Sequence, residues 1–375
     1  MPAIATASSP RAPGSALQRL GSRLSRGSRS NRTRAPFAGT PLPVAIAVSA
    51  GVLCAVMLVS VSAGSVTVSL ADTGRVIFAH VGGKTPGVGF TVDQIVWNYR
   101  LPRVFLAALC GCGLAVSGVI LQALVNNPLA DPYVLGLSSG ASLGAVTVMV
   151  SAGAALGDVG VSTAAFLGAI LTAAVVFVLG QHRGTVVPTR LVLAGVAVGY
   201  LLLAATNYLQ LRATPNELRA VMFWTMGSVA GASWERLGPV TAVVLFVVAV
   251  VLAFGRRLNV LGTGDEQATA LGVDVRTTRI LLLVLASLLT GTLIAVAGGI
   301  GFVGLMIPHL VRLSCGMDHR RLLPLSALLG GTYLVAVDLL SRTVGAPDEL
   351  PLGIFTAVFG APFFLWLLRR DGGRT

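Results

Sequence analysis

Apolar residues gather in long continuous runs along the chain, and polar residues fall between the runs. The first run, residues 43–64, is long enough to cross the roughly 30 Å apolar core of a bilayer as an α-helix. Nine further runs lie at residues 103–125, 133–155, 159–180, 190–211, 238–255, 280–299, 302–315, 322–341 and 351–368. The pattern therefore predicts an all-α polytopic membrane protein with about ten transmembrane helices, of which the eighth is short.

The polar segments divide the chain into one membrane domain and two tails. Residues 1–40 are rich in Ser, Arg, Pro and Gly and have no apolar period, which indicates a disordered basic tail. Organellar transit peptides have a similar composition, but a tail that sets the membrane topology is the simpler interpretation. Residues 41–370 then form the transmembrane domain, and residues 371–375 form a short second tail. Three longer polar stretches interrupt the domain: 65–98, 212–237 with a helix-like core at Pro215–Gly227, and 256–279.

The composition supports this class. The chain is 54% apolar and only 11% charged, with a mean hydropathy of +0.84. A soluble protein carries roughly a quarter charged residues, so this chain could not cover a water-facing surface of its size. Soluble enzymes and disordered proteins are therefore excluded. The four cysteines lie in or beside apolar runs, and Cys110 and Cys112 point to different faces of a helix, so we expect buried thiols and no metal site.

The net charge of +13 gathers in the tail and at the ends of the apolar runs. Seven arginines precede residue 35. If the N-terminus is inside and ten spans alternate, 19 of the 27 basic residues face inward, and without the tail the inner side still leads by 12 to 8. The positive-inside rule therefore predicts that both termini are cytoplasmic, and the charge pattern favours a topology signal over nucleic-acid binding.

Two Gly- and Pro-rich breaks follow corresponding apolar runs. Residues 126–140 come after the second run, residues 297–309 come after the seventh, and the alternation places the two breaks on opposite sides of the membrane. Interrupted helices in two oppositely oriented halves are typical of an inverted repeat that encloses a pathway. Ordinary tight turns between membrane helices are an equal alternative.

Few ionisable residues lie within the apolar runs. Asp338 is the one acid clearly inside a run, and Arg342 follows four residues later on the same helical face, which favours an ion pair. One paired aspartate gives little support to an ion-driven secondary transporter, which stays the alternative class. The sequence contains neither a Walker A motif nor the H-E-x-x-H or G-x-S-x-G motif. We therefore expect no enzyme activity and no cofactor in this chain.

Two polar regions at the membrane surfaces could bind partners. Arg100 and Arg103 precede the second span and Arg342 follows the ninth. Exposed guanidiniums at the outer surface could therefore bind carboxylates, although ordinary flanking charges are the simpler interpretation.

In the inner stretch 256–279, Asp265 suits the start of a short helix and Gly272 its end. Such a capped helix would form a rigid knob for a soluble partner, and a plain loop is the alternative.

Several short motifs follow one another along the chain: Arg100-Leu-Pro-Arg103, Asn127-Pro-Leu-Ala-Asp-Pro132, Leu135-Gly-Leu-Ser-Ser-Gly-Ala141, Ala270-Leu-Gly-Val273, Pro308-His309 with Arg312, and Glu349-Leu-Pro-Leu-Gly353. Together they resemble the FecCD family, the permease subunits of ABC importers for iron–siderophore complexes, haem and cobalamin. The resemblance runs in order from about residue 45 to residue 370.

The resemblance implies a fold and a set of partners. It implies a type II ABC importer permease with ten helices per subunit, in a bacterial plasma membrane. It also implies a dimer, of two copies or with a sister permease, that has the pathway at its interface. Two cytoplasmic ATPase subunits, which bind ATP and Mg, and an extracytoplasmic substrate-binding protein complete the assembly. Iron–siderophore uptake is the leading function, with haem, cobalamin or another chelate as alternatives.

The resemblance also implies residue roles. The arginines at 100, 103 and 342 match those that meet acidic residues of the binding protein. The cytoplasmic gate matches Asn127, Leu129 and Thr189. The segment that couples to the ATPase matches residues 261–272, with Leu261, Gly262, Asp265, Glu266, Ala270, Leu271 and Gly272 as its candidate contacts. Pro308, His309 and Arg312 form a family signature with no clear role beyond shaping the eighth helix.

Overall fold

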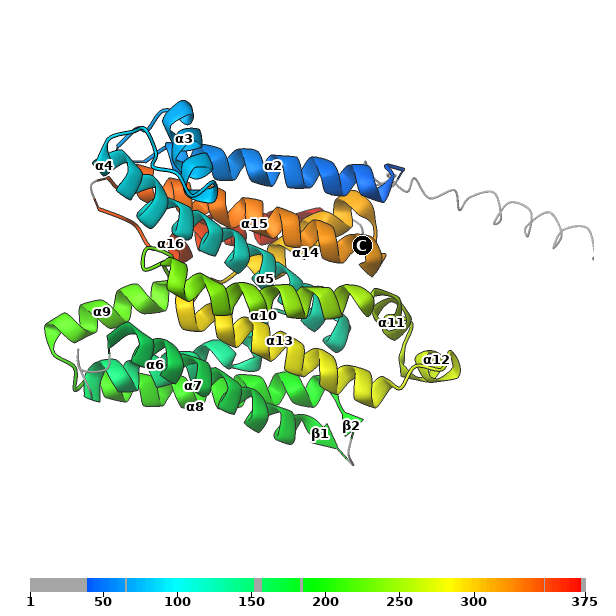
Figure 1. Cartoon of the computed structure of the whole chain (residues 1–375). Helices are drawn as coiled ribbons and strands as arrows, with labels where there is room; N and C mark the ends of the chain where they lie inside the picture. The colour runs from blue at the N-terminus through cyan, green and yellow to red at the C-terminus, as the bar shows by residue number, and fades with distance from the viewer. Residues whose placement is uncertain (1–38, 65, 152–156, 183–184, 347, 372–375) are drawn as a thin grey trace, which may run out of the picture.

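The computed structural model describes residues 39–64, 66–151, 157–182, 185–346 and 348–371. Nearly all of the expected tails, 1–40 and 371–375, lies outside these residues. The described chain is a bundle of helices (Figure 1). Ten of them coincide with the ten predicted apolar runs: α2 (Leu42–Ser62), α5 (Leu101–Val125), α6 (Leu137–Ser151), α7 (Gly157–Gly180), α8 (Pro188–Gln210), α10 (Trp234–Ala253), α13 (Val275–Ala297), α14 (Val303–Cys315), α15 (His319–Val344) and α16 (Leu352–Asp371).

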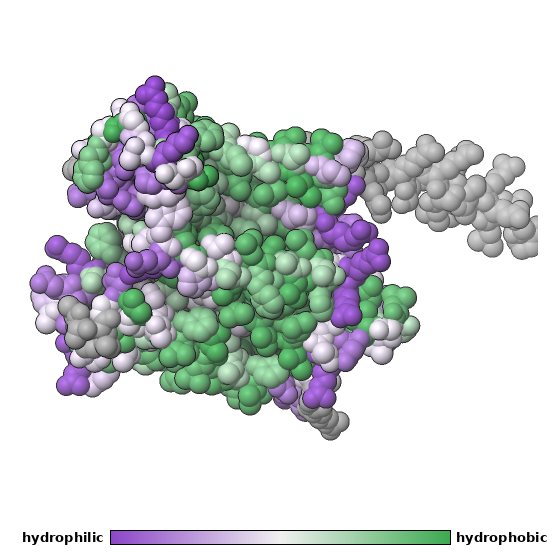
Figure 2. All heavy atoms as spheres, in the orientation of Figure 1, coloured by the Kyte–Doolittle hydropathy of each residue, from purple (hydrophilic) through white to green (hydrophobic). Residues whose placement is uncertain are grey.

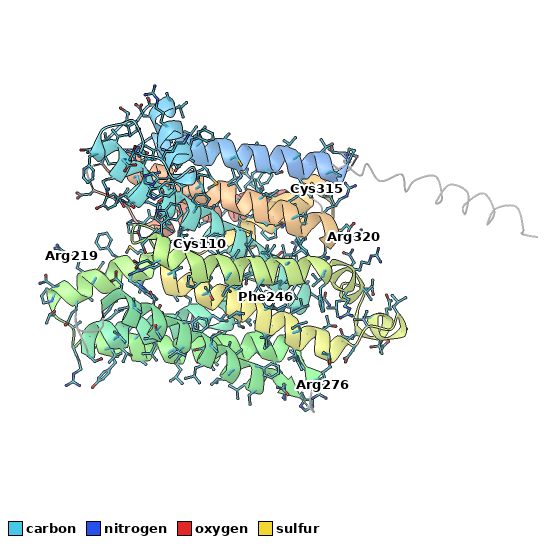
Figure 3. The ribbon with its side chains drawn as sticks, in the orientation of Figure 1. Cys110, Arg219, Phe246, Arg276, Cys315 and Arg320 are labelled. Atoms are coloured by element: carbon cyan, nitrogen blue, oxygen red, sulfur yellow. The ribbon has the colours of Figure 1, made fainter. Side chains whose placement is uncertain are left out.

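The all-α membrane fold is confirmed. Seven helices of the described chain are long and apolar enough to cross a membrane, and α6, α14 and α16 are shorter apolar helices. Figure 2 shows an apolar belt across the middle of the visible face, with hydrophilic residues toward both ends of the bundle. Phe246 on α10 lies within this belt (Figure 3). The belt is the surface that a bilayer would cover.

Short elements gather at the two ends of the bundle. One end carries α3 (Leu70–Val81), α4 (Phe90–Asp93) and α9 (Pro215–Met226), and the other carries α11 (Gly255–Leu261) and α12 (Asp265–Ala270) (Figure 1). The start of α2 and the end of α16 lie at the α12 end, as do Arg276 and Arg320, whereas Arg219 lies at the opposite end (Figures 1 and 3). The first membrane helix therefore starts, and the last one ends, at the same end of the bundle, as an even number of spans requires.

The helix expected within the polar stretch 212–237 is present as α9. It begins with a capping box, in which the hydroxyl of Thr214 accepts from the backbone N–H of Glu217 and the carboxylate of Glu217 accepts from the backbone N–H of Thr214. Gly227, with a φ of 77°, ends it. A small antiparallel pair, β1 (Gln181–His182) with β2 (Thr185–Val186), was not expected from the sequence.

The helix α5 forms the centre of the bundle and is almost entirely buried. Its neighbour α15 approaches closely because Gly111 on α5 faces Gly330 on α15, where an added Cβ would overlap the opposite carbonyl oxygen. By contrast, α2 buries only Ser60 and Val61, and Cys54 on this helix is exposed, so the expectation that all four thiols are buried is wrong for this one.

Both predicted breaks are present. After α5, Asn126 adopts a left-handed φ of 52°, and the short 3₁₀ helix η2 (Pro132–Leu135) precedes α6. After α13, Gly298 and Phe302 have φ values of 68° and 67°. Because α5 starts at the α4 end of the bundle and α13 starts at the α12 end, the breaks lie toward opposite ends, as expected.

Candidate functional site

An arginine cluster lies at the α4 end of the bundle, between α5 and α15. Arg103 is eight residues before Gly111 on α5, and Asp338 is eight residues after Gly330 on α15. The two helices run in opposite directions, so equal offsets from the glycine contact bring Arg103 and Asp338 to the same level. The Nε of Arg103 donates to Oδ1 of Asp338 over 2.9 Å.

Asp338 also pairs with Arg342, one turn along α15. The Nε of Arg342 is 3.1 Å from Oδ2 of Asp338, which confirms the ion pair expected from the i, i+4 spacing. The Nη2 of Arg342 donates to the backbone oxygen and the hydroxyl of Ser60 on α2, over 2.9 and 2.7 Å. One buried carboxylate, 0% exposed, therefore orients two guanidiniums.

The third arginine of the cluster, Arg100, is the last residue of the π-helix η1 (Gln94–Arg100). It donates to the backbone oxygens of Val61, Ser62 and Val66. Val61 and Ser62 are the last two residues of α2, where helix oxygens lack intrahelical partners, and Val66 follows the helix. Arg100 thus ties the end of α2 to the start of α5.

The expectation that the three arginines are exposed is wrong. Arg100, Arg103 and Arg342 are 6%, 8% and 8% exposed. The predicted second span began at residue 103, whereas the helical segment runs from Phe90 through Val125, so Arg100 and Arg103 lie within a continuous helix rather than before its start. Their role in docking stays a prediction.

A cavity of about 340 Å³ opens above this cluster. Its polar wall consists of the three arginines, Tyr99 and Glu349. Both carboxylate oxygens of Glu349 accept from Nη1 of Arg103 over 2.8 Å. With Asp338 beneath, three guanidiniums face two carboxylates, so the cavity has a net positive charge.

At the opposite end of the bundle, α11 and α12 form the knob that the sequence predicted. The helix α12 begins at Asp265, and Gly272, with a φ of 80°, follows its end. The carboxylate of Asp265 is not free, because Nη1 and Nη2 of the buried Arg279 donate to it over 2.9 and 2.8 Å. This forked pair fixes α12 to α13.

Two further acids at this end stabilise helix starts. The hydroxyl and amide of Thr277 donate to Asp274 and hold the pKa of that carboxyl below its usual value. The side-chain amide of Asn259 on α11 donates to Asp318 over 2.7 Å, and this bond lowers the pKa of Asp318. Since Asp318 caps α15, the bond also joins α11 to α15.

The remaining candidates of the coupling segment divide by exposure. Leu261 is buried and anchors α11, whereas Gly262, Glu266, Ala270 and Gly272 are exposed and Leu271 is 66% exposed. A cavity of about 640 Å³ lies beside α12, between β2, the start of α8 and the start of α13. The knob therefore presents one large exposed apolar side chain, that of Leu271, on an anchored base.

The candidate gate residues are exposed at the ends of their helices. Asn127 and Leu129 follow α5, where the side-chain oxygen of Asn127 accepts from the amide of Leu129 over 2.9 Å, and Leu129 is 47% exposed. Thr189 is exposed in the first turn of α8. Their role in gating stays a prediction.

The signature of α14 makes contacts with two other helices. Pro308 is buried inside α14. The ring of His309 lies edge-on to Phe363 and Phe364 of α16, with centroids 6.0 and 6.5 Å apart. A guanidinium nitrogen of Arg312 donates to the side-chain oxygen of Gln122 on α5. The signature thus joins α14 to α5 and α16.

Sequence reasoning gave no role to Glu349, Arg279 or Gln122. Glu349 belongs to one of the family motifs, which was its only signal. The other two residues contact partners across turns or distant helices, and local patterns do not reveal such pairs. Within the described residues, no group of three or more His, Cys, Asp or Glu residues could hold a metal ion.

The chain is similar to known proteins over most of its length. A model of the FecCD transport family matches residues 52–370. This match includes both ends of the bundle, with the arginine cluster and the α12 knob. The chain belongs to the FecCD transport family.

Two relatives show how close the similarity is. The cobalamin import system permease protein BtuC of Halobacterium salinarum is 46% identical over 283 residues, which cover 76% of this chain and 75% of the relative. The hemin transport system permease protein HmuU of Yersinia pestis is 44% identical over 281 residues, which cover 74% of this chain and 84% of the relative.

A solved structure has the same fold. It is an inward-facing conformation of a transporter assigned to the metal-chelate type of ABC transporter, 31% identical, with a TM-score of 0.77 over 88% of this chain and 99% of that one. Family membership and the apolar helices together make this chain an integral membrane permease of the ABC transporter class.

Proposed function

We propose that this chain is the permease subunit of an ATP-driven importer that moves metal chelates, with iron–siderophore complexes as the first candidate cargo, across the plasma membrane. The observation that carries the proposal is the family match over residues 52–370, because it includes all of the bundle except the first part of α2 and the last residue of α16, and both surfaces where partners would bind. The relatives named for cobalamin and hemin support a bulky metal chelate as the class of cargo.

The energy would come from ATPase subunits that bind the α12 end. The sequence has no Walker A motif. The anchoring of α12 by Asp265 and Arg279 suits a part that transmits force, since a push on α12 passes directly to α13. The helix α13 ends at the Gly298–Phe302 break, so its motion would reach the interrupted helices.

A second permease subunit would cover apolar surface that this chain leaves open. The helix α8 has several exposed apolar residues, including Leu193, Tyr200 and Leu201, each at least 64% exposed. Two such surfaces facing each other would enclose a pathway with an apolar lining and few charges. Such a lining binds a polar chelate weakly and so permits its release.

A substrate-binding protein would dock at the α4 end. The positively charged cavity over Arg100, Arg103 and Arg342 suits carboxylates on that protein, and its buried arginines are held ready in position. With both termini in the cytoplasm, as the arginine distribution predicts, this end faces outward.

Uptake by cells that lack their own chelate importers tests the proposal. Cells carrying this permease with its ATPase and binding protein should accumulate a labelled iron–siderophore complex, and they should fail to do so when cellular ATP is depleted. Labelled hemin and cobalamin in the same cells identify the alternative cargoes. Uptake that survives ATP depletion but collapses with an uncoupler would instead support an ion-driven transporter.

The ATPase surface has a test of its own. Leu271→Asp at the exposed tip of the knob should weaken association with the ATPase more than tenfold, because burial of a leucine contributes about 1.5–3 kcal/mol. Leu211→Asp is the matched control, since Leu211 is 86% exposed near α9 at the opposite end. Equal association of both variants would contradict the assignment of this surface.

A further inference from the structure

We infer that Glu349 is an exchangeable internal ligand of Arg103, which an incoming carboxylate of the docking partner displaces. The inference rests on the proposed function, because it assumes that the α4 end receives an acidic partner. It concerns the short segment between α15 and α16 and the cavity that this segment borders.

The two carboxylates that bind Arg103 differ in their exposure to water. Asp338 is 0% exposed and accepts from Nε, whereas the side chain of Glu349 is 45% exposed and accepts from Nη1. A buried ion pair cannot separate without leaving an unpaired charge in an apolar surrounding. An exposed carboxylate separates readily, because water solvates both groups. Exchange at Arg103 is therefore confined to the Glu349 side.

Arg103 keeps its position when Glu349 leaves. Its Nε stays bound to Asp338, and Asp338 is itself held by Arg342. Departure of Glu349 leaves three guanidiniums against one carboxylate, so the cavity gains positive charge. A preorganised donor of this kind suits a carboxylate from outside, because Arg103 and Glu349 both line the cavity and Nη1 is the atom that Glu349 would release.

The segment that carries Glu349 leads directly into α16. The side chain and backbone of Ser341 bond to the backbone of Leu350, and the amide of Leu352 donates to the carbonyl of Gly227 at the end of α9 over 3.0 Å. An added Cβ on Gly353 would overlap the carbonyl oxygen of Met226. These contacts do not involve the side chain of Glu349, so the start of α16 keeps its place against α15 and α9 when that side chain leaves Arg103.

Chemical rescue with acetate tests whether an external carboxylate enters the site. The thermal unfolding midpoint of the full chain in nanodiscs is measured for the wild type, Glu349→Ala and Asp348→Ala, with acetate against chloride at equal ionic strength. Asp348 is the matched control, because it is the neighbouring exposed acid and belongs to none of the ion pairs described. We expect acetate to raise the midpoint of Glu349→Ala alone.

The exchange is overturned if acetate affects Glu349→Ala no more than the wild type, or raises Asp348→Ala equally. Glu349→Gln serves if the alanine variant does not fold, since its neutral amide leaves the guanidinium without a counter-charge and should also respond to acetate.

Docking of the purified substrate-binding protein supplies the second readout. Glu349→Ala should bind it up to about fivefold more tightly than the wild type, because the competing exposed ion pair is gone. Acetate rescue without docking by any variant would refute the proposed function and leave the exchange intact. Docking at equal affinity, without rescue, would refute the exchange and leave the proposed function intact.

Discussion

Replacing Asp338 by Asn tests the central role of this carboxylate in the arginine cluster. The substitution keeps the size of the side chain but removes the charge that balances Arg103 and Arg342 at 2.9 and 3.1 Å. Removing one partner of a buried ion pair costs about 3–5 kcal/mol, because the remaining charge is stranded out of water. We expect Asp338→Asn to lose a free energy of unfolding in that range.

Asp158→Asn is the matched control. Asp158 pairs with Arg236 over the same distance, 2.9 Å, but its side chain is 78% exposed. An exposed pair contributes about 1 kcal/mol at most, so this variant should lose no more than that. The two variants thus separate the effect of burial from the effect of distance.

Chemical denaturation of the purified chain in detergent micelles measures both losses. A second substitution, Arg342→Met, in the Asp338→Asn background should restore part of the lost stability, because it removes one of the stranded charges. If Asp338→Asn loses less than about 1 kcal/mol, or no more than the Asp158 variant, the reasoning about the buried cluster is refuted.

Two further substitutions test the packing and the knob. Gly118→Ala should destabilise the bundle by about 1–3 kcal/mol, because its Cβ would overlap the carbonyl oxygen of Gly304. Gly51→Ala is the control, since a Cβ at Gly51 meets open space. Equal unfolding midpoints for the two variants would contradict the close approach of α5 and α14. Arg279→Gln should release α12 from α13 and so increase the amide hydrogen exchange of α12. Arg276→Gln is the control, because Arg276 is a nearby exposed arginine, and it should leave this exchange unchanged. Unchanged exchange in both variants would show that the forked pair does not anchor the knob.

The helices could be predicted from the sequence because their signal is local. Each apolar run is long, bounded by polar residues, and recognisable without knowledge of its neighbours. The same holds for α12, whose start at Asp265 and end near Gly272 follow from ordinary helix-capping preferences. The Asp338–Arg342 pair could also be predicted, since its spacing is about one helical turn.

The arginine cluster could be predicted only in part. Arg103 and Asp338 are 235 residues apart, and nothing near either one in the sequence indicates the other. The burial of Arg100 and Arg342 depends on the carbonyls at the end of α2, another distant segment. In the sequence, the three arginines therefore looked like charges that flank a membrane helix at the surface, whereas contacts with distant segments bury them.

The sequence also could not show which acids are free to meet a partner. Asp265 lies in the first turn of α12, where acids are commonly exposed, yet Arg279 binds it, so its substitution would disturb the fold of the knob as well as any partner contact. The exposed Leu271 is the cleaner probe of that surface.

Transport by purified proteoliposomes tests the central claim most directly, namely that this chain is a conduit moved by ATPase subunits. The permease is reconstituted alone, and separately with its ATPase and binding protein, and accumulation of a labelled metal chelate is measured with ATP present and absent. We predict accumulation against a gradient only in the complete assembly with ATP. Accumulation by the permease alone would contradict the account.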